Sequence, residues 1–415
     1  MEKNEIQEIQ KKLSKYGQSH LLYGYDKLNE KGKNELINEI EQIDFNLINN
    51  LYNNTKKVKK AEEFDIEPIN FLDKNKLNGQ YKYYENIGEK AIKEGKLAIV
   101  TMAGGQGTRL GHNGPKGTFD IGLESHKSLF ELLSDNIRQE ADKYGVTVPW
   151  FIMTSKENND KTIEFFEANK CFKYEKEKNL FFFKQGELPM VDTEGKILIG
   201  EDGMVKCASD GHGGIYQALV KNGMTKKMRE LGVEWVFIGG VDNCLVKMVD
   251  PILMGIAIEN KVSAAGKSVV KAYPGEKVGV FCKRNGRPSV IEYTELPKEV
   301  AEEKNSNGEL IYGESHILCN LFSLSAIEKM GQKHLPYHSA FKKATYIDKE
   351  GNKIVPTSPN AYKFEAFLFD AFEDLDDMAI LRVNREEEFA PVKNATGVDS
   401  PETARTLYNK LHNLK

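Results

Sequence analysis

The chain has 415 residues, of which 40% are hydrophobic and 29% charged, and its formal net charge is -4 at pH 7. This length allows two or three domains with a buried core, and the charge argues against a general binder of nucleic acid or anionic membranes. No segment has the ~18 consecutive apolar residues of a membrane span, and the charged N-terminus lacks the apolar segment of a signal peptide. Five widely spaced cysteines without a C-x-x-C pair predict reduced, mostly buried thiols. We therefore expect a cytoplasmic protein, a monomer or weak homo-oligomer, without nucleic-acid or membrane partners.

Along the chain, the pattern of apolar residues changes near residue 95. Apolar positions in residues 36–48 follow helical spacing, and we expect residues 1–94 to form a helical N-terminal region. Predicted strands then alternate with helices, as in "KLAIVTMAGG", "SLFELLSDNIRQEADKYG", "VPWFIMTS", "ENNDKTIEFFEAN", "NLFFFKQGELP", "EWVFIGGVDN", "VGVFCKRNG" and "SVIEYTEL". This alternation predicts an α/β domain over 95–380, with a mostly parallel sheet covered by helices on both faces. The pattern changes again near "AILRVNREEEF", and we expect a small C-terminal domain over 381–415.

Three glycines follow the first predicted strand in "MAGGQGTRLGHNGPKG". Ligands of parallel sheets bind at the carboxyl ends of strands, and glycines there let backbone N–H groups approach an anion. A tight structural turn is the alternative. The dinucleotide pattern G-x-G-x-x-G fails at Leu110, and no Walker A string occurs. The string G-G-x-G-T-R-L followed by P-K is typical of nucleotidyltransferases that make nucleotide sugars; Arg109 suits a bidentate phosphate contact and Lys116 a mobile point charge.

Two further residues suit a nucleotide site. The amide of Gln185, in "FKQGELP", can both donate and accept hydrogen bonds, as a uracil edge requires. Asp242 comes directly after a buried strand, where a carboxylate can hold Mg²⁺ on a nucleotide. Its alternative role is to cap a helix or turn.

Together these motifs resemble the eukaryotic-type UDP-N-acetylhexosamine pyrophosphorylase family, within the wider UTP:sugar-1-phosphate uridylyltransferases. The resemblance extends from "HLLYGYDKL" to "REEEFAPVKNA" and "PETAR". It implies a Rossmann-like nucleotidyltransferase domain of the A-type glycosyltransferase kind, with a mixed, mostly parallel sheet, flanked by N- and C-terminal regions. It also implies that UTP and a sugar 1-phosphate, N-acetylglucosamine or N-acetylgalactosamine 1-phosphate, give a UDP-sugar and pyrophosphate, with Mg²⁺ or Mn²⁺ as cofactor.

The resemblance assigns roles to individual positions. The expected catalytic residues are Arg109, Lys116 and Lys393, and the expected metal ligand is Asp242. The expected nucleotide-binding residues are Ala103, Gly104, Gly105, Gln106, Gly107, Thr108, Gln185, Gly211 and Lys363. The expected sugar-binding residues are His212, Gly279, Glu292, Tyr293, His316 and Asn320. Without the resemblance, the isolated lysines 363 and 393 would be interpreted as solvated surface residues, and Glu292 as an exposed residue on an edge strand.

Two positions depart from the family pattern and concern the sugar. His212, in "SDGHGG", replaces the Asn of "PNGNGG", and His316, in "HILCNLFS", matches a sugar-contacting Asn of "NIANHFF". Related glucose and broad-specificity sugar enzymes have G-H-G at the first position, so glucose or galactose 1-phosphate is an alternative substrate. Both histidines have the further alternative of being hydrogen-bonded pocket residues. A nucleotide-binding regulator without turnover is disfavoured because every required charged position is present, and the failed G-x-G-x-x-G pattern disfavours a dinucleotide-dependent oxidoreductase.

Overall fold

The computed structural model describes residues 3–57 and 65–414, and the chain divides into two compact units. Unit 1 contains Met1–Glu62, Gly186–Gly214 and Leu335–Phe367. Unit 2 contains Glu63–Gln185, Ile215–His334 and Leu368–Lys415. This division differs from the three consecutive segments expected from the sequence, because segments far apart in the chain associate within each unit.

The end of the chain belongs to unit 2 and is not a separate domain over 381–415. Its strand β18 (Ala379–Arg382) pairs in parallel with β10 (Ala264–Val270) of the main sheet. The final helix, α13 (Pro401–His412), packs into an apolar cluster of the same unit.

The main sheet of unit 2 is mixed and mostly parallel, as predicted. Besides β10 and β18, its strands are β1 (Ile66–Pro68), β2 (Leu72–Asp73), β3 (Leu97–Met102), β4 (Trp150–Thr154), β5 (Leu180–Lys184), β9 (Trp235–Gly240), β11 (Val280–Arg284), β12 (Arg287–Ile291) and β13 (Glu314–Ser323). The order is β2-β18-β10-β13-β9-β3-β4-β5, with β11 pairing β1, β12 and β13. Along the first path, β13 runs antiparallel to β10 and β9, and the other neighbouring strands are parallel.

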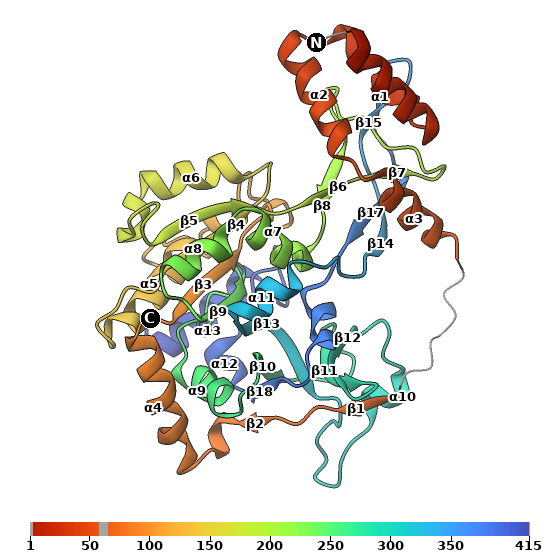
Figure 1. Ribbon diagram of the computed structural model, residues 1–415. Coiled ribbons are helices and arrows are strands. Elements are labelled where there is room, and N and C mark those ends of the chain that lie inside the picture. The colour runs from red at the N-terminus through yellow and green to blue at the C-terminus, as the bar shows by residue number, and fades with distance from the viewer. Residues whose placement is uncertain (1–2, 58–64, 415) are drawn as a thin grey trace. The chain divides into compact units, whose positions relative to one another are not determined.

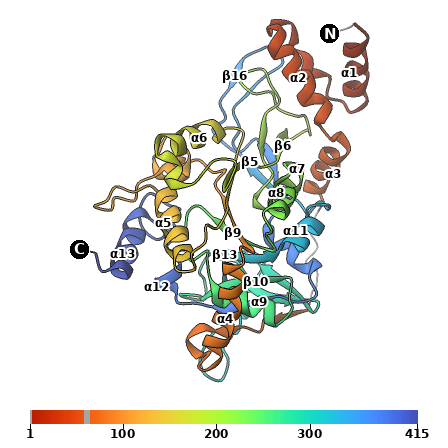
Figure 2. The ribbon, with the colours of Figure 1, turned by 60° about the vertical axis from the view of Figure 1, so that its left-hand side comes forward.

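Helices cover both faces of this sheet. They are α4 (Gln80–Lys93), α5 (Leu129–Asp142), α6 (Asn159–Ala168), α7 (Ile215–Lys221), α8 (Met224–Glu230), α9 (Pro251–Glu259), α10 (Lys298–Glu302), α11 (Leu324–Met330), α12 (Arg385–Glu388) and α13. Figure 2 shows α5 and α6 on the opposite side of the sheet from α7, α8 and α11. Strand β3 is buried along its whole length; Leu97 and Ile99 belong to the core under α4, α5, α6 and α9. Double coverage explains why the predicted strands are continuous apolar runs.

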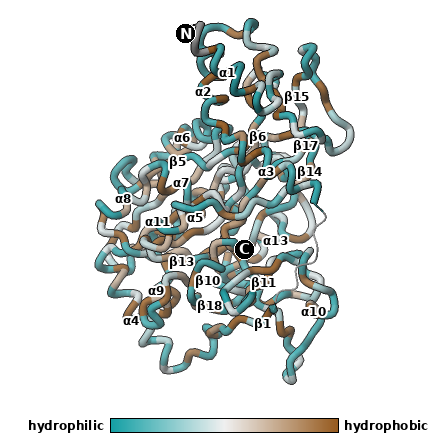
Figure 3. The backbone as a smooth tube through the Cα atoms, turned by 45° about the vertical axis from the view of Figure 1, so that its right-hand side comes forward, coloured by the Kyte–Doolittle hydropathy of each residue, from teal (hydrophilic) through white to brown (hydrophobic). Residues whose placement is uncertain are grey.

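Helices α4 and α9 approach each other through glycines. A Cβ atom on Gly88 of α4 would lie 1.9 Å from the carbonyl oxygen of Pro251, and one on Gly255 of α9 would lie 1.9 Å from that of Tyr84. No larger residue fits at either position without moving the backbone. Figure 3 shows α9 largely brown, in keeping with its apolar sequence PILMGIAIE, of which Ile252–Ala257 are buried.

Unit 1 joins the N-terminal helices to strands from two later segments. Its helices are α1 (Lys3–Lys15), α2 (Glu30–Gln42) and α3 (Phe45–Thr55). Its strands are β6 (Glu187–Pro189), β7 (Val191–Asp192), β8 (Cys207–Ser209), β14 (His338–Lys342), β15 (Tyr346–Ile347), β16 (Lys353–Ile354) and β17 (Ala361–Glu365). Figure 1 shows these red helices beside yellow-green and blue strands. One apolar cluster unites Leu36 and Ile40 of α2 with Val191 of β7 and Phe364 of β17. Within the described part of residues 1–94, helices α1 to α4 form as the helical spacing predicts, and the short strands β1 and β2 lie between α3 and α4; residues 1–2 and 58–64 of the predicted region lie outside the described residues.

No helix within residues 3–57 and 65–414 is both long and apolar enough to cross a membrane. All five cysteines are free thiols, and three of them, Cys244, Cys282 and Cys319, are buried. Burial raises the pKa of Cys244 and of Cys319 to about 12.

Candidate active site

The glycine loop begins where β3 ends and folds back on itself. The N–H of Gly107 donates to the carbonyl of Gly114 at 2.9 Å, and the N–H of Lys116 donates to the carbonyl of Gly105 at 3.0 Å. Arg109 lies on a one-turn 3₁₀ helix and is exposed, whereas Lys116 begins a second 3₁₀ turn and is partly buried. Both cations are therefore presented by a loop whose backbone is hydrogen-bonded across its base.

A residue that sequence reasoning missed, Asn158, anchors this loop. Its side chain is fully buried, and Nδ2 donates to the carbonyl oxygens of Ala103 at 2.9 Å and of Gly105 at 3.3 Å. Its Oδ1 accepts a hydrogen bond of 2.8 Å from the N–H of Ser155. The string "SKENND" gave no signal beyond a helix start, because the acceptors of Asn158 lie more than 50 residues earlier in the chain.

Gln185 and the glycine loop, both predicted to bind the nucleotide, lie together. Gln185 follows β5, and its N–H donates to the carbonyl of Thr154 at 2.8 Å. A Cβ atom on Gly104 would lie 2.4 Å from Oε1 of Gln185, so the glycine makes room for the amide. Within the described residues, the buried Oε1 of Gln106 has no hydrogen-bond partner, and it can accept from a ligand.

Asp242 lies just beyond the end of β9, beside the lysine of the glycine loop. Its Oδ2 is 3.7 Å from Nζ of Lys116, and both side chains are partly exposed. The carbonyl of Asp242 accepts a hydrogen bond of 2.9 Å from the N–H of Val392, so the backbone preceding Lys393 is attached to the Asp242 loop. Nζ of Lys393 is 3.6 Å from Oδ2 of Asp399.

Asp242 offers one carboxylate, and this restricts the kind of metal site that it can form. Among the residues that the structure describes, no group of three or more His, Cys, Asp or Glu side chains could hold a metal ion. Mg²⁺ in nucleotide sites commonly takes one or two carboxylates and fills its remaining positions with phosphate oxygens and water. Asp242 fits that mode of binding, and it does not fit an all-protein metal cage.

Four of the expected sugar-binding residues also come together in unit 2. A Cβ atom on Gly279 would lie 3.4 Å from Oε1 of Glu292, and the carbonyl of Gly279 accepts a hydrogen bond of 2.9 Å from the N–H of His316. Nε2 of His316 is 3.2 Å from Nδ2 of Asn320. The fifth, Tyr293, is 43% exposed and lines a cavity of about 320 Å³.

The imidazole of His316 is held in an aromatic surround. Its ring meets those of Phe281, Phe369 and Phe372 edge-on, with centroid distances of 5.0, 5.7 and 5.8 Å. This geometry matches the alternative of a hydrogen-bonded pocket residue as well as a sugar contact, because one edge of the ring faces Asn320.

The three remaining candidates belong to unit 1. Gly211 has a φ of 88°, and a Cβ atom there would lie 2.3 Å from the carbonyl oxygen of Ala366. The ring of His212 stacks on Phe367 with centroids 5.5 Å apart, and Nζ of Lys363 pairs with Oε1 of Glu365 at 2.7 Å. A glycine is therefore required at residue 211, and His212 is oriented by a neighbouring ring.

Comparison with known proteins agrees with this geometry. Residues 44–400 match the family described as UTP--glucose-1-phosphate uridylyltransferase. The chain belongs to this family. It is 34% identical to a probable UDP-N-acetylglucosamine pyrophosphorylase of Dictyostelium discoideum, over 100% of this chain and 89% of that protein. It is 35% identical to the UDP-N-acetylglucosamine pyrophosphorylase of Saccharomyces cerevisiae, over 95% of this chain and 88% of that protein.

A solved structure extends the likeness to three dimensions. The uridine diphosphate N-acetylglucosamine pyrophosphorylase of Trypanosoma brucei, in complex with an inhibitor, has a TM-score of 0.83 and 32% identity, covering 99% of this chain and 85% of that one. The resemblance inferred from the motifs and the predicted fold class are confirmed.

Proposed function

We propose that this protein is a uridylyltransferase that converts UTP and N-acetylglucosamine 1-phosphate into UDP-N-acetylglucosamine and pyrophosphate. The observation that carries the proposal is the pair formed by Lys116 of the glycine loop and Asp242, at the carboxyl ends of the neighbouring parallel strands β3 and β9. That edge is where ligands bind in parallel α/β sheets. Near full-length similarity to pyrophosphorylases of UDP-N-acetylglucosamine supports the choice of sugar.

The reaction is an in-line substitution at phosphorus. An oxygen of the sugar phosphate forms a bond to the α-phosphorus of UTP, the bond to the bridging oxygen breaks, and pyrophosphate leaves with that electron pair. The attacking oxygen is already ionised at neutral pH, so the protein need not supply a general base. Positioning and charge neutralisation are what remain, as in phosphoryl transfer generally.

Repulsion between the two negatively charged substrates explains why several cationic side chains are expected at the site. Two unit charges ~4 Å apart repel by about 4 kcal/mol at an effective dielectric constant near 20, and each substrate carries more than one charge. In our proposal Arg109 and Lys116 neutralise the UTP phosphates, and Lys393 and Lys363 also contact phosphate groups. Gln185 recognises the uracil edge through its amide. Mg²⁺ or Mn²⁺, held by Asp242 and the substrate phosphates, supplies further neutralisation when bound.

The test is pyrophosphate release from Mg²⁺ and UTP with four sugar 1-phosphates, compared by kcat/KM. The panel contains N-acetylglucosamine, N-acetylgalactosamine, glucose and galactose 1-phosphates. We expect N-acetylglucosamine 1-phosphate to give the highest kcat/KM, with the G-H-G string of His212 compatible with the acetamide. A preference for glucose or galactose 1-phosphate would contradict the sugar assignment, and no release with any of the four would contradict the uridylyltransferase assignment.

A further inference from the structure

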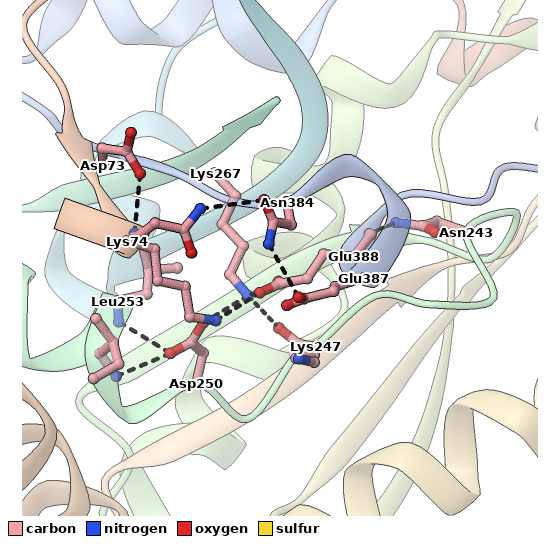
Figure 4. A network of polar contacts seen from close by, with 12 residues as sticks. Asp73, Lys74, Asn243, Lys247, Asp250, Leu253, Lys267, Asn384, Glu387 and Glu388 are labelled. Carbon is pink, nitrogen blue, oxygen red and sulfur yellow. Dashed lines mark hydrogen bonds and ion pairs between the residues drawn. The ribbon is translucent and has the colours of Figure 1, made fainter. Parts of the chain in front are cut away.

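A buried cluster of charged side chains lies in unit 2, and two of its members, Asp250 and Glu388, are close in the chain to Asp242 and Lys393. Nζ of Lys267, on β10, is 2.7 Å from Oδ2 of Asp250 and 2.5 Å from Oε2 of Glu388. Nζ of Lys74 lies 2.8 Å from the other oxygen of Glu388. Figure 4 shows Lys267 pointing between the two acidic side chains. Lys267 is 0% exposed and Glu388 1% exposed, so water does not screen the charges of these two side chains.

The charges of this cluster balance, with two cations and two carboxylates. Burial alone would lower the pKa of Lys267, but attraction to Asp250 and Glu388 and the hydrogen bonds to them outweigh it, so the pKa lies above its usual range. Burial alone would raise the pKa of Asp250, but attraction to Lys267 and Lys74 holds it below its usual range. Lys267 and Asp250 therefore both remain charged at neutral pH.

Through Asp250 and Lys247 the cluster fixes one end of the segment that begins at Asp242. Nζ of Lys267 donates to the carbonyl of Lys247 at 2.9 Å. Oδ1 of Asp250 accepts from the N–H groups of Ile252 at 2.9 Å and Leu253 at 3.2 Å, which caps α9.

Through Glu388 the cluster fixes the start of the segment that ends at Lys393. The carbonyl of Glu388 accepts a hydrogen bond of 2.7 Å from Nδ2 of Asn243, and Oδ1 of Asn243 accepts one of 2.9 Å from the N–H of Ala390. The N–H of Val392 then donates to the carbonyl of Asp242. Residues 388–392 are thus hydrogen-bonded along the loop that starts at Asp242.

We infer that Lys267 is a positioning residue for the reaction: it holds the Asp242 loop and the segment leading to Lys393 in register by joining Asp250, Glu388 and the carbonyl of Lys247. The inference rests on the proposed function only in taking Asp242 and Lys393 as the groups that meet the metal and the phosphates. Replacing a whole buried ion cluster by well-packed apolar side chains is often neutral or stabilising, so stability alone does not account for Lys267, Asp250 and Glu388 at this place. Of the two acidic partners of Lys267, Asp250 lies on the segment that begins at Asp242, and Glu388 lies on the segment that leads to Lys393. The proposed reaction needs these two segments aligned.

The test compares Lys267→Met with Ile256→Ala, which truncates a buried apolar side chain of α9 and removes no charge and no hydrogen bond from the cluster. The melting temperature of each variant is measured first, and the comparison takes the difference in stability loss between the two variants into account. Hydrogen–deuterium exchange is then followed by mass spectrometry in peptides spanning 386–396 and, as reference, the buried strands β3 and β4. Steady-state kinetics give kcat and the KM of the sugar 1-phosphate.

In Lys267→Met we expect exchange in 386–396 to accelerate at least tenfold, with the reference strands unchanged. We also expect kcat to fall about 30-fold while KM changes by less than about threefold, because alignment of Asp242 and Lys393 acts on the transition state. Lys267→Arg, which keeps the charge, is expected to recover part of both losses. If Lys267→Met does not fold, Glu388→Gln, which keeps an acceptor and removes the charge, is expected to give smaller effects in the same direction.

The inference is overturned if exchange and kcat in Lys267→Met equal those of the Ile256→Ala control. The exchange measurement needs no catalysis, so it decides the positioning of 386–396 even if the wild-type protein releases no pyrophosphate. Absence of wild-type activity would therefore refute the proposed function, whereas unchanged exchange would refute the role of Lys267.

Discussion

Unit 2 holds its two lysine-bearing segments by different means. The glycine loop that presents Lys116 is anchored by neutral groups, namely its own backbone and the amide of Asn158. The segment that leads to Lys393 is anchored by the buried charges of Lys267, Asp250 and Glu388. Burying a neutral hydrogen-bonding group costs less desolvation free energy than burying a charge, so neutral hydrogen bonds can be lost one at a time. A buried ion cluster, by contrast, is stable only with all its partners. The first anchor should therefore weaken in steps, and the second should fail as a whole.

The largest expected effect comes from removing the presented cations themselves. Lys116→Ala and Lys393→Ala should each lower kcat by about 10²-fold or more, in line with the loss of one preorganised charge in a transition state. The KM for the sugar 1-phosphate should change far less, since the loss falls on the transition state. Steady-state kinetics check this, with Lys161→Ala, an exposed residue of α6, as control. Near wild-type kcat in either variant would rule out a catalytic role for that lysine.

Next in size is the neutral anchor. Asn158→Ala removes the donor to the buried carbonyl oxygen of Ala103 and to the partly buried one of Gly105, which keeps its hydrogen bond from the N–H of Lys116. We expect the free energy of unfolding to fall by about 2 kcal/mol, the usual cost of stranding buried polar groups. Urea denaturation measures it. The matched control is Asn169→Ala, because that side chain makes a comparable 2.8 Å hydrogen bond to the carbonyl of Phe165 at the surface. Equal losses in the two variants would contradict the anchoring role of Asn158.

A smaller effect is expected where the glycine loop meets Gln185. Gly104→Ala places a methyl group 2.4 Å from Oε1 of Gln185, so the flexible amide must move while the backbone stays in place. We expect the KM for UTP to rise about tenfold, equivalent to about 1.4 kcal/mol, and the preference for UTP over CTP to shrink. In Gly105→Ala no heavy atom lies within 4 Å of the new methyl group, and the UTP/CTP ratio should stay at its wild-type value. A wild-type ratio in Gly104→Ala would show that Gln185 does not select the base.

The smallest expected effect is a difference between the two anchors in how their contribution to stability depends on pH. Because the pKa of Asp250 is held below its usual range, its contribution to stability is complete above about pH 5 and is lost as the pH falls. Because the pKa of Lys267 is raised, its contribution is complete below about pH 9 and is lost only at higher pH. The difference in unfolding free energy between wild type and Asp250→Asn should therefore be constant from pH 6 to 8 and shrink towards pH 4.

The matched comparison for this prediction is Asn158→Ala, whose neutral anchor has no titrating group. Its difference from wild type should keep one value across the same pH range, as urea denaturation at each pH would show. A difference that shrinks equally in both variants would mean that Asp250 carries no special charge dependence.

Sequence reasoning succeeded where the signal was local. The strand at Leu97–Met102 is a buried apolar run, and the glycines after it adjoin it in the chain, so strand and loop could be predicted together. The family resemblance assigned Lys116 and Asp242 to one site, and the structure gives the reason for their nearness: β3 and β9 are neighbouring parallel strands that end at the same edge of the sheet.

Sequence reasoning failed where the cause lies far away in the chain. Lys267 interrupts the strand sequence "AAGKSVV" and looks like an exposed position, since its partners at Asp250 and Glu388 lie 17 and 121 residues away. Unit 1 was missed for the same reason. Its strands are as short as two residues, as in Val191–Asp192, and their pairing with Ala361–Glu365 leaves no periodic pattern to detect.

The discontinuity of unit 1 bears on how the chain matures during synthesis. Its N-terminal helices are made first, but Phe364 of their apolar cluster is made roughly 300 residues later. At about 5 to 20 residues per second, the helices wait on the order of 15 to 60 s for that partner. During this interval the apolar side chains of α2 and α3 lack part of their core, so we expect the nascent N-terminal segment to need protection from aggregation until Phe364 is made.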